Sequence, residues 1–192
     1  SAIHCMLELT RQHPIDPEDL LSIEADVTHI CYKFTADSQH DTDREILIKE
    51  QADHSLAYLL AVALLDGDVT PEQFTSDRIN RADAQRLLRK VTTKPNREYT
   101  QRYPQTMPAK ITVRLKGGKM VMHEVQDYPG LASRPFTWDE EVEKFDKLVS
   151  GRINDALSKE IKNTVRSIEH VKAKDLMQLL SRINATDQYV YA

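Results

Sequence analysis

Apolar residues near the start of the chain recur at helical spacing. They predict a helix over residues 1–13, which must end there because Pro14 cannot continue it. Ten consecutive apolar residues, from Leu56 to Leu65, predict a helix that is buried on every side. Gly67 is well placed to end this second helix in the left-handed conformation. The stripe on the first helix consists of Ile3, Met6, Leu7 and Leu9.

Alternation of apolar and polar residues predicts strands in two places. Residues 21–34 are rich in β-branched and aromatic side chains, and residues 110–125 are typical of a β-hairpin. Gly117 and Gly118 predict a two-residue turn in that hairpin, because glycine adopts positive φ without steric cost. In that register one face carries Leu115, Met120, Val113 and Met122, and the other carries Arg114 and His123.

The remaining patterns predict mostly helices. We expect them over residues 78–91, from a capping box at Thr137 and Glu140, over 155–171 with a break near Lys159, and over 173–183. The expected fold class is therefore α+β: a small antiparallel sheet, including the hairpin at about 110–125, covered by helices in a two-layer sandwich. Residues 1–150 would form this small domain, and residues 151–192 would add trailing C-terminal helices and a polar tail.

Composition narrows the classes of function. The chain has 192 residues, 29% of them charged, and a formal net charge of −4, so we expect no nucleic-acid partner and no anionic membrane surface. Its longest apolar run is shorter than the roughly 20 residues that span a bilayer. Two cysteines favour a reduced, intracellular protein over a disulfide scaffold. Zinc-binding spacings, phosphate-binding glycine loops and nucleophile elbows are absent from the sequence, so we expect no cofactor and no metal.

The head of the apolar helix carries the most suggestive chemistry. His54 and Tyr58 are four residues apart, and in a helix they would lie on one face near its N-terminus, where an anion is favoured. The Tyr58 phenol could donate a hydrogen bond or proton there, and His54 could titrate near neutrality. A structural role is the alternative: Asp53 or Ser55 caps the helix, His54 is solvated and Tyr58 is a core aromatic residue with a bonded hydroxyl.

Four segments, in this order, resemble the C-terminal part of the MmgE/PrpD family, which includes methylcitrate dehydratases, cis-aconitate decarboxylases and iminodisuccinate epimerases. The D-H-S-x-x-Y pattern followed by A-x-A-L-L-D-G is the most specific of them. The segments are SAIHCMLEL, DHSLAYLLAVALLDGDVT, YPQTMPAKITVRLKGGK and YPGLASRPFTWDEEVEKF.

The resemblance implies an active site between a large all-helical domain, which would precede Ser1 and is absent here, and the smaller α+β domain. Tyr58 matches a tyrosine implicated in that site. His54 matches the histidine of the same motif and is the second catalytic candidate, and Ser55 is the candidate substrate-binding residue. His4 does not occupy the place of the histidine that members often carry just upstream of SAIHCMLEL, and Leu131 stands where many members have histidine.

The implied function is that of the C-terminal domain of a cofactor-independent lyase, similar to methylcitrate dehydratase, acting on a small di- or tricarboxylic acid. Alternatives are a decarboxylase or epimerase of the same family, or a non-catalytic assembly or binding module with the same fold. The resemblance also implies a homodimer in the full-length protein and a cytoplasmic or mitochondrial-matrix location. We expect the 192-residue chain alone to be inactive, because it would supply one wall of the cleft.

Overall fold

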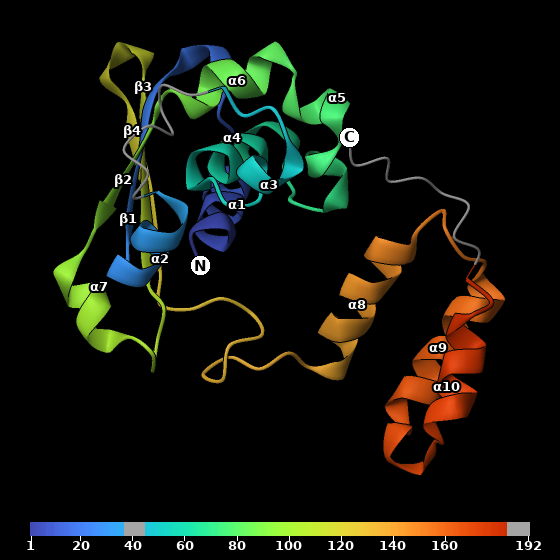
Figure 1. Ribbon diagram of the computed structural model, residues 1–192. Coiled ribbons are helices and arrows are strands. Elements are labelled where there is room, and N and C mark those ends of the chain that lie inside the picture. The colour runs from blue at the N-terminus through green and yellow to red at the C-terminus, as the bar shows by residue number, and fades with distance from the viewer. Residues whose placement is uncertain (37–44, 184–192) are drawn as a thin grey trace. The chain divides into compact units, whose positions relative to one another are not determined.

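A four-stranded sheet forms one layer of the first part of the molecule (Figure 1). The computed structural model describes residues 1–36 and 45–183. Strand order is β2-β1-β3-β4, with antiparallel β1–β3 and β3–β4 pairs and a parallel β1–β2 pair. The fold is α+β as expected, but the sheet is mixed instead of wholly antiparallel. The strands are β1 (Leu20–Val27), β2 (Val91–Pro95), β3 (Ala109–Leu115) and β4 (Met120–Val125).

Helices cover one face of this sheet and enclose the core. Helix α1 (Ala2–Gln12) packs on β3 and β4, and α4 (Leu56–Asp66) packs on α1, on β2 and on α6 (Ala82–Leu88) (Figure 1). The first nine residues of α4 are all buried, as the continuous apolar run predicts, and Gly67 ends the helix at a φ of 70°. Shorter helical segments complete this part. They are η1 (Pro17–Asp19), α2 (His29–Thr35), α3 (Lys49–Ala52), η2 (Pro71–Phe74), α5 (Ser76–Ile79), α7 (Arg97–Arg102) and η3 (Lys116–Gly118).

The hairpin exists where the sequence predicts it, but its register differs by one residue. The connection is the three-residue turn Lys116–Gly118, and the Leu115 N–H donates to the Lys119 carbonyl over 2.8 Å. Arg114 therefore pairs with Met120, and Val113 pairs with Val121. A shift of one residue exchanges the two faces of a strand. Val121 is consequently buried, whereas Met120 and Met122 are exposed.

Three further element boundaries differ from the sequence prediction. The first strand ends at Val27, and Thr28 caps α2 by accepting the Cys31 N–H over 3.3 Å, so residues 29–34 are not strand. The helix expected over 78–91 ends at Leu88, and the next apolar residue, Val91, opens β2. Helix α9 continues unbroken through Lys159.

The described residues from 136 onward form a second compact unit, separate from residues 1–135. Its helices are α8 (Trp138–Val149), α9 (Asp155–Arg166) and α10 (Ala173–Leu180), with the short turn η4 (Ile168–His170). Thr137 and Glu140 form the predicted capping box at the start of α8. The unit has a small core, in which Phe145 and Ile153 pack against Leu157, Ile161 and Leu179.

No helix within residues 1–36 or 45–183 is both long enough and apolar enough to span a membrane. The predicted polar tail after residue 183 lies outside the described residues.

Candidate functional site

The polar head of α4 is built around a side-chain cap. Ser55 is the N-cap residue, and its hydroxyl accepts the Tyr58 backbone N–H over 3.2 Å. Because the helix starts at Leu56, His54 lies before it and does not share a helical face with Tyr58. The two residues differ sharply in exposure, since Tyr58 is fully buried and the His54 side chain is 74% exposed. The structure thus separates the two catalytic candidates that the spacing suggested would lie on one face.

Tyr58 is held inside the core by its hydroxyl. The phenol donates a hydrogen bond to the backbone carbonyl of Gln73, which belongs to η2. The Phe74 ring lies nearby, with its centroid 6.4 Å from that of Tyr58. Burial raises the pKa of the Tyr58 phenol to about 12, so the group is neutral at pH 7. A neutral phenol can donate a hydrogen bond or a proton but cannot act as a base.

An ion pair between the buried Arg78 and Asp66 fixes the segment that accepts the Tyr58 hydrogen bond. Arg78 makes two parallel bonds to Asp66, from Nε over 2.8 Å and from Nη2 over 2.9 Å. The Gln73 amide donates to the same carboxylate over 3.1 Å. Burial alone would raise the pKa of Asp66, but the hydrogen bonds from Arg78 and Gln73 outweigh it and lower that pKa. The position of the Gln73 carbonyl therefore depends on this ion pair.

His54 belongs to a small exposed cluster. Its Nδ1 lies 2.5 Å from Oδ1 of Asp53, whose other oxygen accepts a hydrogen bond from Lys49 over 3.1 Å. Because a carboxylate can only accept, this contact places the imidazole proton on Nδ1. In the neutral form of the ring, the lone pair is then on Nε2. Burial favours a higher pKa for Asp53, but the bonds from His54 and Lys49 lower it.

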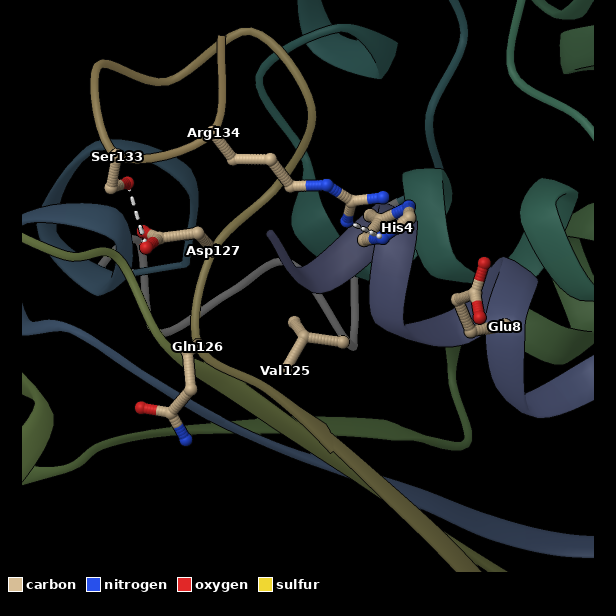
Figure 2. A pocket seen from close by; sticks show the side chains of 7 residues that line it. All are labelled: His4, Glu8, Val125, Gln126, Asp127, Ser133 and Arg134. Atoms are coloured by element: carbon tan, nitrogen blue, oxygen red, sulfur yellow. Dashed lines mark hydrogen bonds between the residues drawn. The ribbon is translucent and has the colours of Figure 1, made fainter.

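A pocket of about 430 Å³ lies elsewhere in the same unit, between α1 and the loop that follows β4 (Figure 2). The Arg134 Nη1 lies 3.2 Å from the Nε2 of His4, on the first turn of α1. A guanidinium can only donate, so His4 accepts through Nε2 and is neutral. Burial and the nearby Arg134 charge lower the pKa of His4 against the opposing effect of Glu8. The pocket is lined by His4, Glu8, Val125, Gln126, Asp127, Ser133 and Arg134.

Asp127 ties the loop of this pocket to the segment that leads into β3. One oxygen of this carboxylate accepts the Met107 N–H over 2.8 Å, and the other accepts the Ser133 hydroxyl over 2.7 Å. Sequence reasoning did not bring these residues together, because His4 and Arg134 are 130 positions apart. No local spacing pattern in the sequence predicts a contact between residues so far apart in the chain.

The polar groups of the described residues offer no ready metal centre. Within residues 1–36 and 45–183, no group of three or more histidine, cysteine, aspartate or glutamate side chains is arranged to hold a metal ion.

Comparison with known families gives a match over most of the chain. The model of the MmgE/PrpD C-terminal domain matches residues 1–170, which include the head of α4, the hairpin and the loop after β4.

Proposed function

The chain belongs to the MmgE/PrpD family, as its C-terminal domain, and we propose that it serves a cofactor-independent lyase acting on a small di- or tricarboxylic acid. The observation that carries this proposal is the family match over residues 1–170, which includes the D-H-S-x-x-Y segment at Asp53–Tyr58. The reaction would be a dehydration similar to that of methylcitrate dehydratase. It would begin with removal of a proton next to a carboxylate and end with loss of water.

In this proposal the chain supplies one wall of the active-site cleft, and a helical domain supplies the other. Tyr58 would donate a hydrogen bond to the charge that develops on the substrate, because its phenol has a pKa of about 12 and keeps its proton at pH 7. The phenol donates its hydrogen bond to the Gln73 carbonyl in this structure. A role on substrate therefore requires that the bond to the η2 segment break. The lone pair of His54 could accept a proton at the exposed end of the same motif.

Other members of the same class of enzymes remain candidates. A cis-aconitate decarboxylase would release carbon dioxide, and an epimerase would return the proton to the opposite face. A non-catalytic assembly or binding module is favoured by one specific observation: Ser55 and Tyr58 both have structural hydrogen-bond partners. That arrangement is what a purely structural role would require.

The proposal is tested by joining the chain to a helical domain from the family in one polypeptide. Dehydration of 2-methylcitrate is followed by the ultraviolet absorbance of the new conjugated double bond, decarboxylation by carbon dioxide release, and epimerisation by exchange of the substrate's C–H proton in D₂O. We expect the dehydration signal from the joined protein and none from the 192-residue chain alone.

Two results would contradict the proposal. A folded joined protein that shows none of the three reactions would favour the non-catalytic module. Steady turnover by the chain alone would show that it carries the complete catalytic machinery, and the one-wall arrangement would be wrong.

A further inference from the structure

We propose that the pocket between α1 and the loop after β4 binds one carboxylate arm of a small polycarboxylic acid, with the Arg134 guanidinium as its anchor. The identity of the acid as a substrate rests on the proposed function. Binding of the carboxylate itself rests only on the pocket's geometry and charges.

Arg134 is a cation whose charge is not matched by an acid. Among the residues that the structure describes, its hydrogen-bond partner is the neutral ring of His4, and no carboxylate pairs with it. The bond to His4 uses Nη1, which leaves the edge formed by Nη2 and Nε. That edge presents two parallel N–H donors, the geometry that binds a carboxylate through both oxygens. His4 therefore orients the guanidinium while leaving its binding edge available.

The two acids that line the pocket explain why it would take a single arm. Asp127 is occupied at both oxygens, by the Met107 N–H and the Ser133 hydroxyl. Glu8 has an ion pair with Arg11, at 3.3 Å. These acids still carry negative charge, so they would repel a second carboxylate at close range. The remaining arms of a polyacid would extend out of the open side.

Figure 2 shows the arrangement that this requires. The Arg134 side chain reaches from the loop toward α1 and ends beside His4, while Ser133 and Asp127 face each other across the base of the loop. A volume of about 430 Å³ lies within the range of small-molecule pockets and leaves room for a carboxylate arm beside the guanidinium.

The test is a titration of the isotope-labelled 192-residue chain with tricarballylate, followed by nuclear magnetic resonance. The signals to follow are the Arg134 Nε–H and the His4 ring. We expect both to shift saturably, and Arg134→Gln to weaken binding at least tenfold. Arg134→Lys should weaken it nearly as much, because lysine keeps the charge but loses the two parallel donors. Arg114→Gln is the matched control: it removes one exposed arginine on the outer face of β3 and should leave binding unchanged.

Several outcomes would overturn the inference. Equal weakening by Arg114→Gln would show attraction to net charge alone. Full binding by Arg134→Lys would show that the two-donor contact is not needed. If inorganic sulfate shifted the same signals at the same concentration, the pocket would be a general anion site. Because no turnover is measured, failure here leaves the proposed lyase function standing. Conversely, binding without turnover in the joined protein would refute that function and leave the pocket assigned.

Discussion

Replacing Tyr58 with phenylalanine removes one hydroxyl from the core and changes almost no volume. The side chain is fully buried, and its hydroxyl donates to the Gln73 carbonyl. Tyr58→Phe leaves that carbonyl without its tyrosine donor, in a residue that is itself only 9% exposed. A lost buried hydrogen bond of this kind costs about 1–2 kcal/mol. For a domain of this size, the melting temperature should fall by about 3–6 °C.

The same variant separates a catalytic role from a structural one. If the phenol contacts substrate as charge develops, kcat of the joined protein should fall about a hundredfold, equivalent to about 2.7 kcal/mol, with little change in KM. Tyr99→Phe is the matched control, because Tyr99 is 4% exposed and its hydroxyl lies near the Glu124 carboxylate. Burial and this carboxylate raise the pKa of the Tyr99 phenol. It should lower the melting temperature and leave kcat unchanged.

Thermal unfolding followed by circular dichroism, together with steady-state rates, measures both effects for both variants. A Tyr58→Phe protein with unchanged kcat and a lowered melting temperature would return Tyr58 to a purely structural role. An unchanged melting temperature would refute the reasoning at an earlier step, because the hydrogen bond to Gln73 would then contribute nothing to stability.

Four further predictions concern the stability of the fold and the protection of its helices from hydrogen exchange. Arg78→Met should lower the free energy of unfolding by about 2–4 kcal/mol in urea denaturation. It removes the arginine partner of Asp66 and one of the two arginine partners of Asp83, whose side chains are only 20% and 25% exposed. Because the pKa of Asp66 is lowered from 3.8, its charged form stabilises the fold at pH values above 3.8. This stabilisation is lost as the pH falls through the folded pKa, so the difference in stability between wild type and Asp66→Asn should narrow below about pH 4. Gly117→Ala, at a φ of 75°, should cost about 1 kcal/mol by thermal unfolding, whereas Lys119→Ala, at a φ of −67°, should cost little. Amide hydrogens of α9 should exchange faster than those of α4 because its unit has the smaller core, and equal protection would contradict this.

Local patterns were sufficient to locate helices α1 and α4 and the start of α8. The ten-residue apolar run became the buried helix α4, and Thr137 with Glu140 became a capping box, because caps and helical faces depend on residues within one or two turns. The hairpin was also located correctly, but not its register. That depended on one extra residue in the turn, and on burying Val121 instead of Met122.

Long-range pairing was beyond the sequence. Strand β2 pairs in parallel with β1, with Val91 opposite Ile23, although several helices lie between the two strands in the sequence. Nothing in the five residues of β2 indicates this partner. The motif was sufficient to locate the head of α4. The different environments of His54 and Tyr58 depend on where the helix begins and on the hydrogen bond from the Tyr58 phenol to the Gln73 carbonyl.

The pocket at Arg134 shows the same division. Its loop and its helix are each readable in the sequence, yet a loop arginine and a helical histidine carry no mark of a contact across 130 positions. The sequence determined helices α1 and α4, the location of the hairpin and the family motif, because these depend on neighbours along the chain. The tertiary structure alone decided which side chains meet, because packing of α1 against β4 brings the loop after that strand to the first turn of the helix.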